Sequence, residues 1–418
     1  RHQFDIHSTA PESFTLVGPY DAGDEYYRDI YVHNTQGNIE IAGGENNDGF
    51  YVYDLGEGKE ATIFGKGGDD TLWVGRIDNS TDEQIDAMAS TIRWSGGGGN
   101  DSIDAVFEAA KKIDIEIFDD ARGINTATIT CVDSPKCVIW SRESFIASVH
   151  NMSGLISTLS KMSVRDSAYV HAAFLRLNGE ENEVHFDDTL AVFDVIGGPG
   201  NDNFYIGREY NSTELSQDML LTNTVNGYIS KGNSHPITIN GNFGDDEFLV
   251  LHNTQVLDLN GDSGNDKLEV RSQLATPDMT GMQLPDYIVN SLVDFNGGTG
   301  DDSVFVAGTV ANDSYVATSS EFRGAGLSIK YKSIEQLGST SEESDKLTLL
   351  ATDPSQVSNL FNDSPKIPDV INPLQVDPII SKNLKGHKGI IEHQVLALND
   401  TGYSGLYVEG TTVNVLDN

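Results

Sequence analysis

Basic residues are scarce in this chain of 418 residues: 26 Lys and Arg stand against 64 Asp and Glu, and the formal net charge is −38. Contacts to phosphates need Lys and Arg, so this balance argues against nucleic acid as a partner. A charge of this size also opposes compaction through self-repulsion unless cations neutralise it. The composition is equally compatible with an acidic surface that only keeps the protein soluble.

Long apolar runs and the common catalytic motifs are also missing. No run is long enough to cross a bilayer, so we expect no membrane span. The sequence holds no GxSxG, HExxH, phosphate-loop or dinucleotide pattern, and its ten His residues are scattered. We therefore predict a protein that is not an enzyme, and we expect His7 and His185 to be ordinary surface or turn residues. The chain opens with Arg1 rather than Met, from which we expect a processed form or a fragment.

Cysteine is nearly absent. Cys131 and Cys137 are the only two, in the segment TCVDSPKC. This spacing favours a short disulfide loop formed in an oxidising compartment, and two reduced thiols are the alternative. The sequence has seven Asn-x-Ser/Thr sequons, and six of them are candidate sites for glycosylation of a secreted chain. The seventh, at Asn100, lies in a glycine turn where a glycan would be crowded. The six candidate sites are Asn79, Asn151, Asn211, Asn312, Asn362 and Asn399.

Glycine, in contrast, is abundant, with 42 residues, and much of it belongs to one repeated pattern of eight residues. Each copy is rich in glycine or other turn-forming residues, reaches Asp at its sixth position and has an apolar residue at its eighth. Apolar, strand-like segments flank most copies, so the unit predicts strand, tight turn, strand. The seven copies are GGENNDGF (43–50), GKGGDDTL (65–72), GGGGNDSI (96–103), GGPGNDNF (197–204), GNFGDDEF (241–248), GDSGNDKL (261–268) and GGTGDDSV (297–304).

This pattern resembles the glycine/aspartate repeat of RTX, or haemolysin-type, calcium-binding proteins, which form extracellular parallel β-rolls and β-helices. The resemblance implies Ca²⁺ held between successive turns by aspartate and carbonyl oxygens, the hard ligands that Ca²⁺ prefers. By position, the implied ligands are Asp48, Asp70, Asp101, Asp202, Asp246, Asp266 and Asp302. Three weaker candidates precede them by one residue: Asp69, Asp245 and Asp301.

The spacing of the turns departs from the tandem nine-residue repeat of that family. The first glycines are separated by 22, 31, 101, 44, 20 and 36 residues. A separation of 20 or 22 corresponds to one coil of a β-helix, so we expect direct stacking only for the pairs 43/65 and 241/261. Turns that close coils without any metal are the alternative interpretation.

The predicted fold is all-β: a right-handed parallel β-helix with a few short helical or loop insertions. We divide it into coils at 1–110, irregular coils with the disulfide loop at 111–190, coils with glycine turns at 191–350, and a Pro-rich excursion with final strands at 351–418. Within the second part, the spacing of Phe145, Val149, Met152, Ile156 and Leu159 predicts a helix over 141–162, although Gly154 argues against it. Residues 80–83 resemble a capping box that opens a second short helix.

Together these features predict an extracellular, calcium-stabilised structural or adhesive protein of a cell surface, matrix or filament. Its final strands lack a polar cap, so we expect the chain to continue or to pack end to end with a copy of itself or a neighbouring domain. One alternative is a polysaccharide lyase or epimerase, which would need a basic cleft that the sequence does not reveal. Another is a glycan-binding module that uses a row of Trp73, Trp94 and Trp140.

Overall fold

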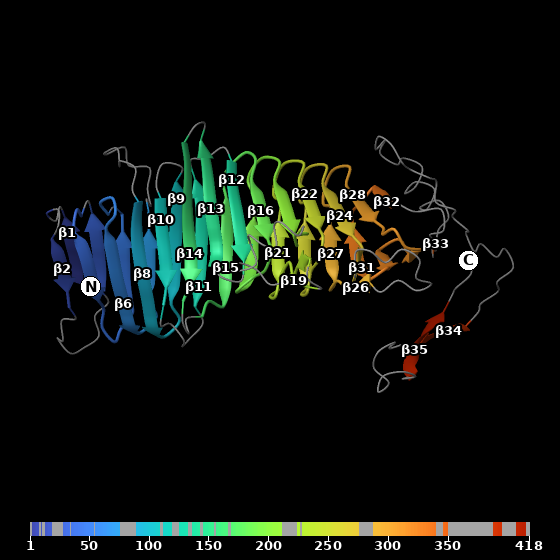
Figure 1. Cartoon of the computed structure of the whole chain (residues 1–418), viewed down its shortest axis with the longest axis horizontal. Helices are drawn as coiled ribbons and strands as arrows, with labels where there is room; N and C mark the ends of the chain where they lie inside the picture. The colour runs from blue at the N-terminus through green and yellow to red at the C-terminus, as the bar shows by residue number, and fades with distance from the viewer. Residues whose placement is uncertain are drawn as a thin grey trace. The chain divides into compact units, whose positions relative to one another are not determined.

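A computed structural model describes the chain as two compact units, residues 1–376 and 377–418. The residues that it describes are 2–7, 10, 13–18, 28–33, 35–53, 55–75, 89–108, 112–118, 125–132, 136–142, 145–153, 156–165, 169–210, 224–225, 228–275, 287–339, 346–349, 388–394 and 407–414. All regular structure in these residues is β (Figure 1). The predicted all-β class is therefore confirmed.

Two long sheets build the first unit (Figure 1). The first sheet has 15 strands within the described residues and takes mainly odd-numbered ones. In spatial order they are β1 (His2–His7), β3 (Arg28–His33), β5 (Asp48–Val52), β7 (Thr71–Val74), β9 (Ser102–Glu108), β11 (Thr126–Val132), β15 (Ala172–Leu177), β17 (Val192–Ile196), β21 (Ile237–Asn240), β23 (Leu257–Asn260), β27 (Val293–Asn296), β31 (Leu327–Lys332), β30 (Glu321–Gly324), β29 (Ser314–Ala317) and β33 (Lys346–Leu349).

The second sheet has 14 strands within the described residues. In spatial order they are β2 (Phe14–Val17), β4 (Asn38–Ala42), β6 (Glu60–Gly67), β8 (Ala89–Gly98), β10 (Lys112–Ile117), β14 (Ile156–Val164), β13 (Phe145–Ser153), β12 (Lys136–Arg142), β16 (Glu183–Phe186), β18 (Asn203–Ile206), β22 (Glu247–Val250), β24 (Lys267–Arg271), β28 (Ser303–Ala307) and β32 (Gln336–Ser339). Two short pairs lie beside the sheets: β19 (Thr224–Val225) with β20 (Ile229–Ser230), and β25 (Gln273–Leu274) with β26 (Tyr287–Ile288).

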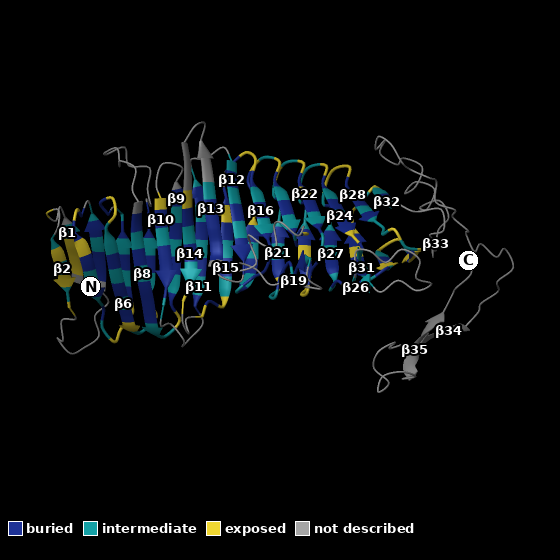
Figure 2. Cartoon of the chain, in the orientation of Figure 1, coloured by how far each residue is buried: buried dark blue, intermediate teal, exposed yellow. Residues whose placement is uncertain are grey.

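Alternation of side chains explains why these segments form strands. In β5, Phe50 and Val52 are buried whereas Tyr51 points outward, and β7 and β18 alternate in the same way. One face of most strands therefore contributes to a shared interior, and Figure 2 shows these buried residues in dark blue, recurring along the strands of both sheets. The apolar residue at the eighth position of every glycine turn lies in this core: Phe50, Leu72, Ile103, Phe204, Phe248, Leu268 and Val304.

Parallel pairing dominates but is not universal. The strands β12, β13 and β14 pair antiparallel, and so do β29, β30 and β31 near the end of the first sheet. The structure therefore confirms the all-β class but not a parallel β-helix throughout.

The helix predicted over 141–162 is wrong. Residues 145–153 and 156–164 are the strands β13 and β14, and Gly154 falls between them. The spacing of apolar residues misled the prediction because it ignored burial: Val149 is 1% exposed, whereas Leu159 is 52% exposed. The capping box at 80–83 lies outside the described residues.

The second unit contains one described hairpin, β34 (Lys388–Gln394) paired antiparallel with β35 (Tyr407–Asn414). Across the described part of both units, the chain has no helix of the length and apolarity that a membrane span requires.

Candidate metal centre

The seven glycine turns connect the two sheets, but at opposite edges of the first unit. The turns at 43–50, 65–72 and 96–103 lead from the second sheet into the first, whereas the four turns from 197 onward lead from the first sheet into the second. Strands that pair in parallel point the same way, so these two kinds of connection lie at opposite edges. Figure 2 shows their exposed residues along the lower rim near β6 and along the upper rim above β22 and β28.

The aspartate at the sixth position of each turn is buried and forms a ladder with its neighbours. In the N-terminal column (Asp48, Asp70 and Asp101), the Asp48 amide donates to Asp70 Oδ1 at 2.7 Å and the Asp70 amide donates to Asp101 Oδ1 at 2.8 Å. The C-terminal column consists of Asp202, Asp246, Asp266 and Asp302. Its successive amide-to-Oδ1 distances are 2.7, 2.8 and 2.8 Å. One oxygen of almost every carboxylate thus holds the preceding turn.

The expectation that only the pairs 43/65 and 241/261 stack directly is wrong. Turn 65 also stacks on turn 96, turn 197 on 241, and turn 261 on 297, as the parallel pairs β7–β9, β18–β22 and β24–β28 require. The extra residues fall between other strands, in 76–88, 211–227 and 276–286, which lie outside or largely outside the described residues. Turn spacing along the sequence therefore varies although the turns are neighbours in space.

The second carboxylate oxygen distinguishes two kinds of turn. In the first turn of each column, Oδ2 accepts the amide of the second turn residue: Gly44 donates to Asp48 at 2.7 Å, and Gly198 donates to Asp202 at 2.6 Å. In the five other turns, Oδ2 is buried and has no hydrogen-bond partner in the described part of the chain. These five carboxylates belong to Asp70, Asp101, Asp246, Asp266 and Asp302.

Backbone conformation accompanies this difference. The second residue of each of the five turns has a left-handed backbone, whereas Gly44 and Gly198 do not. The φ values are 82° at Lys66, 94° at Gly97, 80° at Asn242, 68° at Asp262 and 104° at Gly298. Three of these residues are not glycine, and a left-handed L-residue costs roughly 1–2 kcal/mol. Strain repeated at equivalent positions is typical of sites with a specific role.

Four of the five unpartnered oxygens, on Asp70, Asp246, Asp266 and Asp302, face a carbonyl oxygen across the space beside the first glycine of the turn. A Cβ added to Gly241 would lie 2.1 Å from Asp246 Oδ2 and 2.8 Å from the Gly261 carbonyl oxygen. A Cβ added to Gly65 would lie 2.2 Å from Asp70 Oδ2 and 2.6 Å from the Gly96 carbonyl oxygen. Only glycine leaves this space open. Two acceptors without a donor between them require a proton or a cation.

Burial makes these carboxyl groups hard to ionise. Desolvation, together with the charges of neighbouring aspartates, raises the pKa of Asp70 and of Asp246 to about 8, and that of Asp266 to about 6. Desolvation also raises the pKa values of Asp101 and Asp302. Neutral carboxyl groups or bound cations would both relieve this cost.

The donor atoms suit calcium in kind. They are carboxylate and carbonyl oxygens in a dry environment, and Ca²⁺ takes six to eight such ligands. Within the described residues, however, no point gathers three side chains of Asp, Glu, His or Cys. A cation in a column would therefore depend on backbone carbonyls, such as that of Gly261, as much as on the aspartates.

The weaker candidates Asp69, Asp245 and Asp301 belong to a separate, exposed ladder at the fifth turn position. Its hydrogen bonds run in the opposite direction, from each turn back to the one before: the Asp69 amide donates to Asn47 Oδ1 at 2.8 Å, and the Asn265 amide donates to Asp245 Oδ1 at 2.7 Å. Asn and Asp alternate strictly along it, so no two carboxylates are neighbours. The members are Asn47, Asp69 and Asn100 at one edge and Asn201, Asp245, Asn265 and Asp301 at the other.

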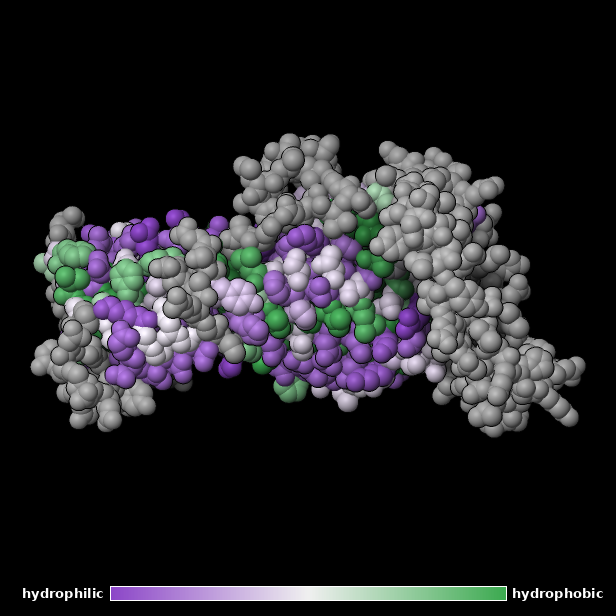
Figure 3. All heavy atoms as spheres, turned by 90° about the horizontal axis from the view of Figure 1, so that it is seen from below, coloured by the Kyte–Doolittle hydropathy of each residue, from purple (hydrophilic) through white to green (hydrophobic). Residues whose placement is uncertain are grey.

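Figure 3 views the molecule from below, and the N-terminal rim that carries part of this ladder is hydrophilic to neutral there. In this exposed ladder Asp69 and Asp245, which the sequence pattern suggested as additional ligands, instead accept hydrogen bonds from the backbone amides of the following turns. In this ladder each turn donates a hydrogen bond to the preceding turn, whereas in the inner column each turn donates to the following one, so the two ladders together hold neighbouring turns in both directions.

Three members of the columns escaped the sequence analysis because they are not Asp. Asn125 Oδ1 accepts the Asp101 amide at 3.1 Å, Asn182 donates its amide to Asp202 Oδ1 at 2.7 Å, and Glu335 Oε2 accepts the Asp302 amide at 2.8 Å. A buried apolar residue two positions later, as at Val184 and Leu337, is the signal that could have identified them.

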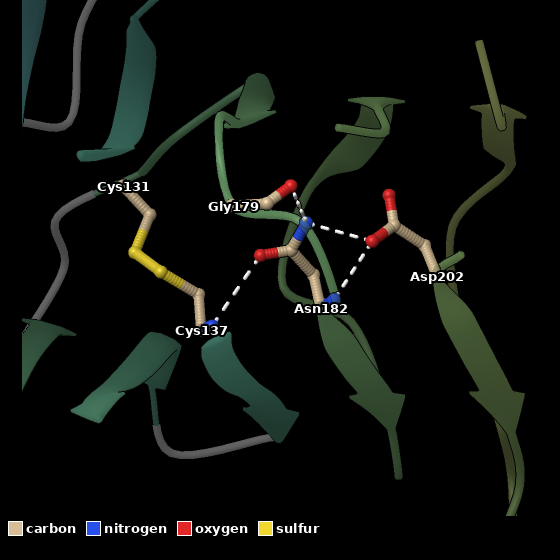
Figure 4. The surroundings of a disulfide bond; sticks show 5 residues. All are labelled: Cys131, Cys137, Gly179, Asn182 and Asp202. Atoms are coloured by element: carbon tan, nitrogen blue, oxygen red, sulfur yellow. Dashed lines mark hydrogen bonds between the residues drawn. A yellow bond between two sulfur atoms is a disulfide. The ribbon is translucent and has the colours of Figure 1, made fainter. Parts of the chain in front are cut away.

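The structure joins Cys131 and Cys137 as a disulfide, with both residues fully buried (Figure 4). Of the sequons, Asn312 is exposed in the segment before β29, and Asn151 lies in β13. Asn79, Asn211, Asn362 and Asn399 lie outside the described residues.

The row of three tryptophans is not formed. Trp94 is 1% exposed and packs edge-on against Phe50 in the core. Trp140 instead stacks on His185, with ring centroids 3.9 Å apart, and His185 stacks on Tyr205 at 4.6 Å. These rings cover one another's faces, so they offer mainly edges to a sugar.

A small basic group that the sequence did not reveal lies beside Trp140. The guanidinium groups of Arg142 and Arg208 are 5.1 and 5.3 Å from the centre of its ring. Arg142 also pairs with the buried Asp187 at 3.0 Å. This carboxylate neutralises the charge of Arg142, whereas binding an acidic polysaccharide would require a surface with excess positive charge.

No protein-family model matches the chain, and neither does any curated protein sequence.

Proposed function

We propose that this chain is an extracellular structural or adhesive protein, a right-handed parallel β-helix in its main course, whose buried aspartate columns are neutralised by calcium. The observation that carries the proposal is the set of five buried carboxylate oxygens that have no hydrogen-bond partner in the described part of the chain. Three of them, on Asp70, Asp246 and Asp266, face a glycine carbonyl, and that of Asp302 faces the Ser333 carbonyl.

The strand order supports the β-helix. Successive strands alternate between two sheets, and each pairs in parallel with the strand two places away along most of the chain. Such a rod has a narrow core and a long surface, which suits a scaffold better than a deep catalytic pocket. The antiparallel group β12–β13–β14 is then an insertion in the rod.

The geometry favours five cation positions rather than seven. The carboxylates would belong to Asp70 and Asp101 at one edge and to Asp246, Asp266 and Asp302 at the other. Asp48 and Asp202 are less suitable because a backbone amide already donates to Oδ2 of each, and the Asn182 amide also donates to Asp202 Oδ1.

Calcium would also offset the self-repulsion of a chain with a net charge of −38. Sites in extracellular modules bind Ca²⁺ with dissociation constants on the order of 10⁻⁴–10⁻³ M, and such weak sites suffice outside cells. Because bound metal stabilises only the folded state, its binding free energy adds to the stability of the rod. A rigid rod of this kind suits a surface, matrix or filament.

Isothermal titration calorimetry of the chelator-stripped full chain tests the proposal, together with thermal unfolding. We expect up to five Ca²⁺ per chain, a melting temperature that rises with calcium, and no comparable effect of Mg²⁺. Asp266→Asn should remove one equivalent, whereas the control Asp48→Asn should keep all of them. Absence of binding heat, with a melting temperature that chelator does not change, would mean that protons neutralise the columns instead.

A further inference from the structure

The disulfide lies where the chain moves its glycine turns from one edge to the other. The N-terminal column ends at Asn125, just before β11, and the turns at the opposite edge begin with Asn182, just before β16. Between them, the antiparallel strands β12, β13 and β14 enter the second sheet. Cys131 is in β11 and Cys137 is in β12, so the bond links the two sheets at this junction.

A continuous series of hydrogen bonds leads from the disulfide into the C-terminal column (Figure 4). The Cys137 amide donates to Asn182 Oδ1 at 3.3 Å. Asn182 then donates both its backbone amide and its Nδ2–H to Asp202 Oδ1, each at 2.7 Å. The Asp202 amide continues the series to Asp246. Each of these groups is buried, where a hydrogen bond matters most because water cannot replace it.

Asn182 is suited to this position. Its Oδ1 accepts from Cys137, and its Nδ2 donates to the Gly179 carbonyl at 3.1 Å as well as to Asp202. A carboxylate could not donate and would face Asp202 with like charge. The end of the N-terminal column is held differently, since Asn125 donates its Nδ2–H to the Tyr169 carbonyl at 3.1 Å.

We propose that the Cys131–Cys137 disulfide is a redox-dependent anchor of the C-terminal column. While the bond is intact, it fixes Cys137 and, through Asn182, the position of Asp202 and the turns that follow. Reduction by a dithiol supplies two electrons and two protons, converts the disulfide into two thiols and oxidises the dithiol. Because the bond is buried, this step needs local opening of the junction. The N-terminal column, on the other side of the junction, keeps its stability. This inference does not depend on calcium.

Hydrogen exchange measured by mass spectrometry on the full chain tests the anchor. In the variant C131A/C137A, and in wild-type protein treated with dithiothreitol, we expect exchange in peptides covering Asn182 and Asp202 to rise about tenfold, the effect of losing one or two buried hydrogen bonds. Peptides covering Asp48 and Asp70 should not change.

The variant Asn182→Ala keeps the disulfide but removes the side-chain hydrogen bonds that link Cys137 to Asp202, so it remains informative if the cysteine variant does not fold. It should reproduce the faster exchange at Asp202, and combining it with C131A/C137A should add little. Equal acceleration in both columns would overturn the proposal, because it would indicate a general loss of stability. A change confined to residues near 131–137, or no effect of Asn182→Ala, would overturn it as well.

Discussion

Asp246→Asn tests the physical account of the columns most directly, because the asparagine keeps the shape of the side chain but removes its charge. Its Oδ1 can still accept the Asp202 amide, which lies 2.7 Å from the aspartate oxygen. Its Nδ2 takes the place of the unpartnered Oδ2 and faces the Gly261 carbonyl oxygen. The Nδ2–H group thus supplies the donor that the aspartate lacks. Asn125 already shows this arrangement, with Oδ1 toward the column and Nδ2 toward a carbonyl.

The expected effect follows from the pKa of Asp246, which burial raises from 3.8 to about 8. Without cations at pH 7, the wild-type chain must take up a proton at this group to fold, at a cost of up to about 4 kcal/mol at 1.36 kcal/mol per pH unit. The asparagine has no such cost. We expect Asp246→Asn to raise the free energy of unfolding by about 2–4 kcal/mol in metal-free buffer.

Calcium should narrow the difference in stability between the variant and the wild type. Wild-type protein gains the binding free energy of a cation at this position, about 2.7 kcal/mol when free calcium is one hundred times the dissociation constant, and the variant does not. Urea unfolding followed by circular dichroism, in chelator and in millimolar calcium, measures both differences. The matched control is Asp202→Asn, whose amide nitrogen would meet the Gly198 amide donor, and it should destabilise the chain in both buffers.

Two results would refute parts of this reasoning. If Asp246→Asn destabilises the metal-free chain, the space beside Gly241 does not lack a donor, and the account of the unpartnered oxygens fails. If the variant is more stable than wild type in both buffers to the same extent, the columns are neutralised by protons, and the calcium proposal fails alone.

Two further predictions concern the same columns. The pKa values of Asp70 and Asp246 are about 8 in the folded chain and 3.8 when unperturbed, so the folded state holds their protons more tightly. The free energy of unfolding without metal should therefore be higher at pH 5 and fall toward pH 8, by up to about 1.4 kcal/mol per pH unit for each group. Urea unfolding across this pH range measures the change, and a flat profile would contradict the pKa shifts. Gly241→Ala should destabilise the chain by about 3 kcal/mol or more, since the new Cβ would lie 2.1 Å from Asp246 Oδ2, whereas Gly18→Ala, with nothing within 4 Å, should be neutral in the same thermal-unfolding assay.

The local pattern of the turns was predictable from the sequence. A glycine that must stay free of Cβ, an Asp at the sixth position and an apolar residue at the eighth are consequences of backbone sterics, hydrogen bonding and burial within eight residues. The structure places each of these side chains as that local chemistry requires, with Asp246 and Phe248 buried and Asp245 exposed. The all-β class follows from the same alternation of buried and exposed residues.

Only the tertiary structure decided which turns are neighbours. Stacking depends on strand pairing, and insertions between other strands change the spacing of the turns in the sequence without changing their pairing in space. For this reason Asp70 lies against Asp101 although 31 residues separate them. The helix expected over 141–162 failed similarly, because the neighbouring strands β10 and β16 offered sheet edges that a local pattern cannot show.

The sequence by itself thus determined the all-β class, the chemistry of the turns and the identity of the aspartates, since these depend on interactions within a few residues. The tertiary structure decided that the aspartates form two columns at opposite edges, and that five of them keep an oxygen without a partner among the described residues. It also decided that the disulfide lies next to the start of the second column. Those properties depend on which strands lie side by side, and pairing between distant strands is set by the packing of the whole chain.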